Sequence, residues 1–273
     1  MSEESLASYA PWRVTYPSGD LELSGFFITP PGTGPFPTVL FHHGSGGLRP
    51  HDRDGIDTLR AMGYAVFVPL RRGHHGNPGL YWLDRITHPW GDPKMGPQLV
   101  AALQDECSDA LAALEWVVAR DTVDSERIAM CGHSYGGVMV MLSAARTSAF
   151  RAGVSFAGPS QSWSDVPCLR ELLITAMRDV KAPLLLLQAA NDHSLLTTYT
   201  LAAELFRAGK PHEVRIYPPI GSSPIEGHGL FGRAPGLWRA DVEPFLLRTI
   251  GAGSRGCYSS SSGDDGHSST RLT

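Results

Sequence analysis

The chain has 273 residues, a net charge of -4 at pH 7, 42% hydrophobic residues and 18% charged residues. This composition provides enough apolar material for a sizeable core, and the weakly acidic charge without a basic cluster excludes a typical nucleic-acid-binding protein. The acidic N-terminus lacks the apolar run of a secretory signal, and no apolar stretch is long enough to span a bilayer, so we expect a cytoplasmic protein without membrane association.

The cysteines and histidines argue against a disulfide framework and against a metal centre. The four cysteines are widely spaced and form no Cys-x-x-Cys pair, which favours free thiols. The adjacent pairs His42-His43 and His74-His75 do not share a helix face, and no zinc-binding signature occurs. We therefore expect neither a metal nor a cofactor.

The predicted elements begin with a β-hairpin and continue with a βα alternation. Residues 12–16 and 21–29 alternate apolar and polar around a turn, and a Pro- and Gly-rich break follows at 30–35. Short apolar runs then alternate with helical patterns, which indicates a mostly parallel sheet of about eight strands with helices on both faces. The further expected strands are 37–41, 65–70, 127–131, 152–156, 183–189 and 213–217, and the expected helices are 54–62, 99–120, 137–145, 195–208 and 237–250.

Two long stretches and the C-terminal tail do not fit this alternation. Residues 71–97 are rich in Gly, Pro and aromatic side chains, and residues 159–180 carry Trp163 and a short amphipathic helix at 168–177. We expect both to form pocket walls, because a long loop in a compact domain is usually functional, and neither is long enough for a separate cap domain. We expect one catalytic domain over 1–250 and a disordered Ser- and Gly-rich tail over 251–273.

A Gly-x-Ser-x-Gly motif places Ser134 between an apolar strand and a small-residue helix. The motif reads Gly132-His133-Ser134-Tyr135-Gly136. A tight strand-to-helix turn exposes the serine hydroxyl, and flanking glycines remove Cβ clashes there. This setting predicts Ser134 as a nucleophile, whereas the motif alone could arise by chance.

A serine hydroxyl needs a neighbouring base, and in such folds the acid and the base follow the nucleophile in chain order. Asp192 follows the strand at 183–189, and His228 precedes the last helix on a loop with a glycine on each side. We predict His228 as the general base and Asp192 as the acid that orients it. His193 and Glu226 are less suitable partners because they adjoin the predicted acid or base, and Asp165 is the best rival acid.

The transition state of acyl transfer also needs two N–H donors for its oxyanion. We predict that Tyr135, directly after the nucleophile, supplies one of them. The Gly-rich loop after the strand at 37–41 supplies the other, with Ser45 as the first choice and Gly46 as the second. A plain Gly-rich turn is the alternative reading of this loop.

These residues resemble the dienelactone hydrolase-like branch of the α/β-hydrolase superfamily over about residues 12–250. The resemblance rests on His43-Gly44, the glycines around Ser134, Asn191-Asp192 and Gly227-His228. Arg72-Gly73 is also similar to a segment of the related prolyl-oligopeptidase catalytic domains. The resemblance implies an α/β-hydrolase fold. Dienelactone hydrolases proper carry cysteine as nucleophile, so Ser134 favours ordinary ester chemistry.

The long loop offers side chains that could contact substrate. Arg71 and Arg72 could bind a substrate carboxylate, or they could form ion pairs that hold the loop in place. Tyr81, Trp82 and Trp90 could line an acyl or alcohol pocket, as could Trp163, or they could simply pack the loop.

The sequence predicts a serine hydrolase of small-molecule esters or lactones with the triad Ser134, Asp192 and His228 and no cofactor. A peptidase of prolyl-oligopeptidase type stays open, with Asp84 or Asp92 as weak anchors for a peptide amine. An acyltransferase or lyase using the same triad, and a ligand-binding protein with little turnover, also stay open. Neither the oligomeric state nor the substrate can be predicted.

Overall fold

The computed structural model describes residues 9–253 of the chain. The tail that was expected to be disordered spans 251–273. Residues 254–273 of this tail, including Cys257, lie outside the described residues. Cys107, Cys131 and Cys168 are free thiols, as expected.

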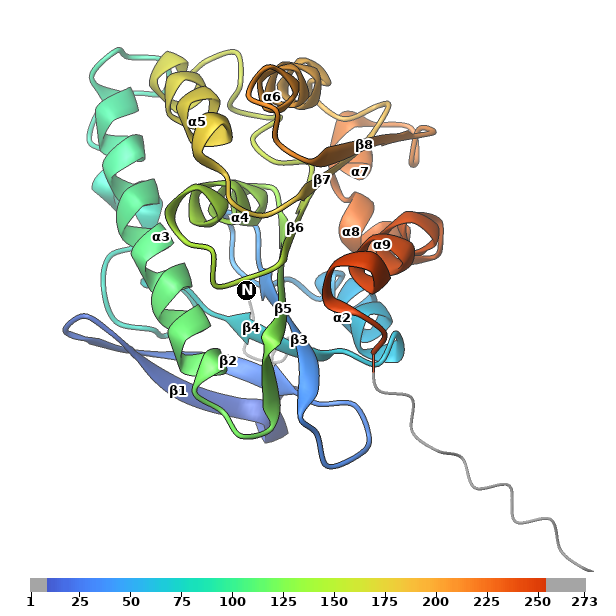
Figure 1. Ribbon diagram of the computed structural model, residues 1–273. Coiled ribbons are helices and arrows are strands. Elements are labelled where there is room, and N and C mark those ends of the chain that lie inside the picture. Colours follow the sequence, from blue (N-terminus) through green and yellow to red (C-terminus); the bar gives the residue numbers. More distant parts are fainter. Residues whose placement is uncertain (1–8, 254–273) are drawn as a thin grey trace, which may run out of the picture.

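An eight-stranded sheet forms the centre of the protein (Figure 1), in the order β1-β2-β4-β3-β5-β6-β7-β8. The pairings of β1 with β2 and of β2 with β4 are antiparallel, and every other pairing is parallel. The strands are β1 (Arg13–Ser18), β2 (Leu21–Ile28), β3 (Phe36–His42), β4 (Ala65–Pro69), β5 (Val123–His133), β6 (Ala152–Phe156), β7 (Leu184–Ala189) and β8 (His212–Tyr217). This arrangement confirms the predicted α/β-hydrolase fold.

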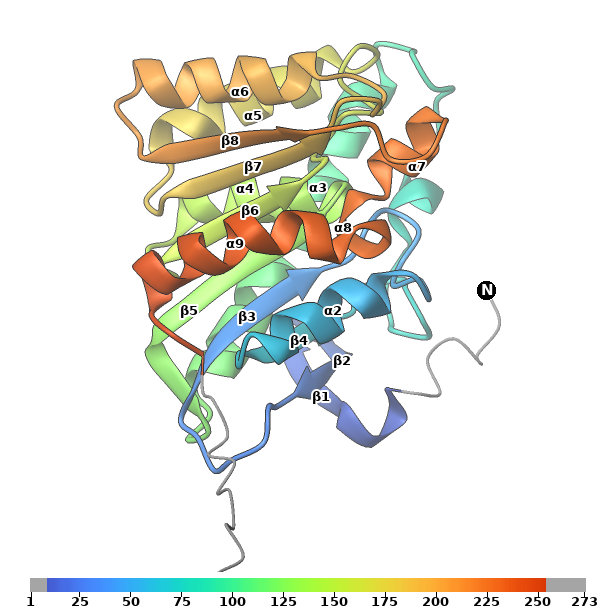
Figure 2. The ribbon, with the colours of Figure 1, turned by 90° about the vertical axis from the view of Figure 1, so that its right-hand side faces the viewer.

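Helices cover both faces of the sheet, and Figure 1 shows the two layers on either side of it. One layer holds α3 (Met95–Val118), α4 (Tyr135–Arg146), α5 (Pro167–Asp179) and α6 (Leu196–Arg207), and the other holds α2 (Asp52–Ala61), α8 (Leu230–Arg233) and α9 (Pro235–Ile250). Figure 2 shows α9 and α2 lying across the second face. A buried hydrophobic cluster therefore lies on each face of the sheet. Four strands are buried along their whole length, namely β3, β4, β6 and β7, which explains their continuous apolar runs.

The structure extends several predicted elements and adds others. The helix α3 begins at Met95, inside the stretch expected to be a loop, and a 3-10 turn, η2 (Trp82–Arg85), lies in the same stretch. A 3-10 turn, η1 (Ala10–Trp12), precedes β1, and two short helices, α7 (Pro224–His228) and α8, precede α9. In residues 9–253, no helix is both long and apolar enough to cross a bilayer.

The parallel strands bring their carboxyl ends to one edge of the sheet. Ser45 follows β3, Ser134 follows β5, and Asp192 follows β7. Ligands of open α/β sheets bind at this edge, outside the carboxyl ends of the strands. The fold therefore gathers residues that lie far apart in the sequence at one site.

Candidate active site

Ser134 occupies a strained turn between β5 and α4. Its φ of 56° and ψ of -118° are uncommon for a residue with a side chain. A Cβ at Gly132 would overlap the carbonyl oxygen of Gly136, and a Cβ at Gly136 would overlap that of His42. The two glycines therefore permit the turn, which holds the serine at the N-terminus of α4.

The imidazole of His228 joins Ser134 to a carboxylate. Its Nε2 lies 2.9 Å from Ser134 Oγ, and its Nδ1 lies 3.0 Å from Asp192 Oδ1. With Nδ1 protonated and donating to the carboxylate, Nε2 can accept the serine proton. The structure thus places the three residues in the order serine, imidazole and carboxylate.

Asp192 is held by four donors, one of them a serine that the sequence analysis did not single out. Ser160 Oγ donates to Asp192 Oδ1 at 2.9 Å and lies 3.0 Å from His228 Nδ1. Gln188 Nε2 donates to Oδ2 at 2.8 Å, and the His193 backbone N–H donates to Oδ1 at 2.6 Å. Burial opposes ionisation, but the hydrogen bonds from His228, Gln188 and His193 hold the pKa of Asp192 below its ordinary value. Ser160 lies just after β6, at the edge of the sheet where the site residues gather. This position was the signal in the sequence that could have identified Ser160 as a site residue.

His228 lies at the end of a short helix and not, as was expected, on a loop. His228 ends the helix α7, which begins with a reciprocal capping box between Ser223 and Glu226. A Cβ at Gly227 would overlap the side chain of Asn191, which itself hydrogen-bonds the backbone at 220 and 223. Gly227 is therefore required for the close approach of α7 to the loop after β7.

The side chains of the rival residues make their hydrogen bonds outside the series of Ser134, His228 and Asp192, although the ring of His193 packs edge-on against that of His228 with the centroids 5.6 Å apart. Asp165 is exposed, and its Oδ2 accepts a hydrogen bond from Trp90 Nε1 at 3.2 Å. The ring of His193 is exposed, with its Nε2 3.0 Å from Gln161 Nε2. The carboxylate of Glu226 caps its own helix.

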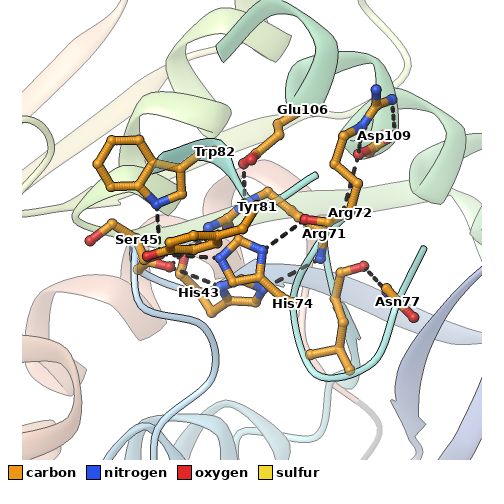
Figure 3. Close-up of polar contacts among 12 residues, drawn as sticks. His43, Ser45, Arg71, Arg72, His74, Asn77, Tyr81, Trp82, Glu106 and Asp109 are labelled. Carbon is orange, nitrogen blue, oxygen red and sulfur yellow. Dashed lines mark hydrogen bonds and ion pairs between the residues drawn. The ribbon is translucent and has the colours of Figure 1, made fainter. Parts of the chain in front are cut away.

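Ser45 and Tyr135 both line the cavity that contains Ser134. Over residues 9–253, neither of their backbone N–H groups donates to another protein group. The carbonyl of Ser45 instead accepts hydrogen bonds from Trp82 Nε1 at 3.0 Å and from the Tyr81 hydroxyl at 3.1 Å. Figure 3 shows the two aromatic side chains converging on Ser45.

The expectation that Arg72 lines the pocket is corrected by the structure. Its Nε donates to Asp109 Oδ2 and its Nη2 donates to Asp109 Oδ1, both at 2.7 Å. This hydrogen bonding raises the pKa of Arg72. The bidentate pair ties the loop to α3 and occupies the face of the guanidinium that could have bound a substrate carboxylate. Ion pairing is therefore the role that the geometry supports.

Two of the four aromatic side chains expected in the pocket line it. Trp82 and Trp90 contribute to its wall. Tyr81 does not, because it packs edge-on against His74 with the ring centroids 4.9 Å apart and hydrogen-bonds Ser45. Trp163 is 2% exposed and belongs to the hydrophobic core.

Ser134 lies between two cavities of different character. The larger one, about 310 Å³, is walled mainly by apolar side chains, several of them from helices that the sequence analysis did not connect with the pocket. These side chains include Leu99 and Leu103 of α3, Val138 of α4 and Leu169 of α5. The smaller one, about 70 Å³, is polar and includes Arg49, Asp52 and His228. Among residues 9–253, no cluster of three His, Cys, Asp or Glu side chains could hold a metal ion.

The chain is similar in sequence to known proteins over most of its length. The model of the dienelactone hydrolase family matches residues 23–224. The chain is 26% identical over 213 residues to a protein of Methylorubrum extorquens whose name provisionally assigns it as a carboxymethylenebutenolidase, and the alignment covers 77% of this chain and 70% of that protein.

Two solved structures show the same fold. The acylaminoacyl peptidase of Pyrococcus horikoshii superposes with a TM-score of 0.67 at 22% identity, over 89% of this chain. The chain spans only 42% of that peptidase. A dienelactone hydrolase of Anabaena variabilis superposes with a TM-score of 0.64 at 21% identity, over 88% of this chain and 97% of the other.

Proposed function

Because the chain belongs to the dienelactone hydrolase family and is on that ground a hydrolase, we propose that it cleaves carboxylic esters or lactones of small molecules through an acyl-enzyme on Ser134. The observation that carries this proposal is the unbroken hydrogen-bonded series from Ser134 Oγ through His228 to Asp192, at 2.9 Å and 3.0 Å. That arrangement is what a serine needs to act as a nucleophile at neutral pH.

In the acylation step, His228 Nε2 takes the Ser134 proton while Oγ attacks the ester carbonyl. The tetrahedral oxyanion accepts hydrogen bonds from the N–H groups of Tyr135 and Ser45, with the N-terminal end of the α4 dipole behind them. His228 then gives its proton to the departing alcohol oxygen as the C–O bond breaks.

In the deacylation step, His228 removes a proton from water, and the water oxygen attacks the acyl carbonyl. The second tetrahedral intermediate collapses, the bond to Ser134 breaks, and His228 returns its proton to Oγ. Asp192 stays ionised throughout, consistent with its lowered pKa, and stabilises the imidazolium formed in each step.

The larger cavity supports a substrate with one apolar side. Its wall is built mostly from Leu, Val and Trp side chains, and it contains no acidic residue that could anchor a peptide amine. Asp84 and Asp92, the weak candidates for such an anchor, are not among the lining residues. The cavity therefore favours an ester with an apolar acyl or alcohol group over a peptide with a free N-terminus.

A p-nitrophenyl ester series tests the proposal. We expect kcat/KM to rise from acetate toward hexanoate, by up to about fourfold for each added methylene that enters the apolar cavity. We expect Ser134→Ala to remove this turnover and also the labelling of the protein by a fluorophosphonate. Undiminished turnover in Ser134→Ala would refute the mechanism. Faster cleavage of peptide anilides than of all the esters would instead favour a peptidase.

A further inference from the structure

Arg71 is a fully buried cation that the chemistry above does not use. It follows β4 directly and is 1% exposed. Its guanidinium donates from Nε to Glu106 Oε2 at 2.6 Å, from Nη1 to the His43 carbonyl at 2.7 Å, and from Nη2 to the Gly44 carbonyl at 2.8 Å. Figure 3 shows Arg71 with Glu106 on one side and His43 on the other. All three guanidinium nitrogens are therefore engaged, two of them by the loop that carries Ser45.

We propose that Arg71, held by Glu106, positions and polarises the backbone N–H groups that form the oxyanion hole. The inference rests on the proposed function, since it assigns Arg71 as a positioning residue for that same acyl-transfer site. Arg71 would act through the peptide units of residues 43–45 and would never touch the substrate.

The geometry of the peptide unit carries the first part of the argument. The carbonyl of Gly44 and the N–H of Ser45 belong to one planar trans unit, so the two groups point in opposite directions. Since Arg71 binds the Gly44 carbonyl, the Ser45 N–H faces away from Arg71. Gly44 itself lies beside the nucleophile, because a Cβ built on it would be 3.7 Å from Ser134 Cβ. Arg71 thus helps to fix which way this N–H points, together with the Gly47 N–H and His43 Nδ1, which also lie within hydrogen-bond distance of the Gly44 carbonyl.

The charge of Arg71 carries the second part. A carbonyl that accepts a hydrogen bond from a cation is polarised, and the N–H of the same peptide unit becomes a stronger donor. The effect is large in a buried setting, where water does not screen it. Glu106, 0% exposed, compensates the charge that would otherwise be buried alone.

Arg71 also contacts the other predicted donor residue. Its guanidinium carbon lies 4.8 Å from the centroid of the Tyr135 ring. Tyr135 follows the nucleophile and supplies the second N–H of the proposed hole. One side chain therefore contacts both segments that carry the proposed donors, the loop before Ser45 and the side chain of Tyr135.

The neighbouring pair provides a matched control. Arg72 is the next residue after Arg71, and Asp109 lies about one turn after Glu106 in α3. The two side chains also form an ion pair, at 2.7 Å. Neither side chain of this pair bonds the carbonyls of His43 or Gly44. A variant of this pair reports what the loss of a loop-to-helix ion pair does by itself.

The test compares the double variants Arg71→Met/Glu106→Met and Arg72→Met/Asp109→Met, so that no charge is left buried without a partner. The readouts are kcat and KM on an ester, affinity for an alkyl trifluoromethyl ketone, and the rate of fluorophosphonate labelling of Ser134. Ser134 Oγ adds to the ketone carbonyl, its proton passes to His228, and the former carbonyl oxygen becomes an oxyanion. In the labelling reaction a bond forms between Oγ and phosphorus, fluoride departs, and the serine proton passes to His228.

We expect the Arg71/Glu106 variant to lose roughly 100-fold in kcat, in ketone affinity and in labelling rate, with KM within about threefold, as for impaired oxyanion stabilisation. The Arg72/Asp109 variant should keep all three values within about threefold. If the Arg71/Glu106 variant folds and keeps its labelling rate, or if both pairs lose activity equally, the inference is wrong.

Arg71→Lys decides the matter if the double variant does not fold. A single ammonium nitrogen keeps the charge but cannot reproduce the fork that reaches Glu106 and both carbonyls, so we expect at least tenfold slower labelling. Unchanged labelling in this variant would also overturn the inference. Wild-type protein that takes the label on Ser134 but hydrolyses none of the esters would refute the proposed substrate class, and it would leave this test intact.

Discussion

Two networks reach Ser134 from opposite sides, and they are built differently. On the acid-base side, the side chains of His228, Asp192 and Ser160 lie within 3.0 Å of one another or of the serine. On the loop side, the groups that face the site are backbone N–H groups, and the side chains behind them bind the carbonyls of residues 43–45.

The difference separates chemistry from its support. In the proposed mechanism, His228 and Asp192 exchange or orient the moving proton, so the loss of either removes a step of the reaction. A side chain on the loop side only orients a peptide unit that stays present after mutation. We therefore expect the loss of His228 or Asp192 to be far more damaging than any single substitution on the loop side, and the following predictions test that asymmetry.

The largest effect is expected at Asp192. Asp192→Asn keeps the size of the side chain but removes the charge that fixes the His228 tautomer, so kcat should fall by about four orders of magnitude. Steady-state hydrolysis of a p-nitrophenyl ester measures this. Asp165→Asn, which alters the exposed rival acid, is the control and should leave kcat within about twofold. The assignment of the acid is wrong if Asp165→Asn is the more damaging change.

The same asymmetry explains what could be predicted from the sequence. Ser134, Asp192 and His228 each stand at the end of a recognisable strand or before a recognisable helix, and chain order assigned their roles. The strands and helices were predictable for the same reason, since the period of the apolar residues reports them directly.

The loop side was not predictable, because its contacts join residues that no local pattern relates. Arg72 was expected in the pocket and is bound to Asp109, which lies 37 residues away. Leu99, Leu103 and Leu169 follow a helical period and serve as cavity wall, a role that periodicity cannot distinguish from core. Ser160 has only its place after a strand to mark it.

Acid should weaken the fold through the buried His42 before it protonates Asp192. Burial lowers the pKa of His42 to about 3 from 6.5. As the pH falls, His42 is therefore protonated in the unfolded chain before it is protonated in the folded protein. The contribution of neutral His42 to the free energy of unfolding is complete above pH 6.5 and is lost as the pH falls toward 3. The pKa of Asp192 is also lowered, from 3.8, so its contribution is lost only below that value.

Urea unfolding of wild type and His42→Leu at pH 7 and pH 5 tests this order. Neither ring nitrogen of His42 has a partner within the described residues, so the apolar replacement should be tolerated at pH 7. Between pH 7 and pH 5, the free energy of unfolding should fall by about 2 kcal/mol more in wild type than in the variant. Equal losses in both proteins would show that His42 is not buried in its neutral form.

A smaller effect is expected at Ser160, which supports the acid-base side without taking part in proton transfer. Ser160→Ala removes one donor from Asp192 and should lower kcat by about tenfold with KM nearly unchanged. Ser164→Ala, an exposed serine of the same loop, should change neither constant. A loss below twofold in Ser160→Ala would mean that Gln188 and the His193 N–H suffice to hold Asp192.

The smallest effect is expected from the aromatic side chains behind Ser45, and it distinguishes positioning from pocket lining. Tyr81→Phe removes one hydrogen bond to the Ser45 carbonyl without altering the cavity wall, so kcat should fall about threefold with KM unchanged. Trp82→Phe removes a hydrogen bond to the same carbonyl and also enlarges the cavity, so its KM should change with acyl chain length. Measuring kcat and KM over the series from acetate to hexanoate separates the two variants. If Tyr81→Phe shows the same dependence on chain length as Trp82→Phe, Tyr81 contacts the substrate, and the division between positioning side chains and pocket side chains fails on the loop side.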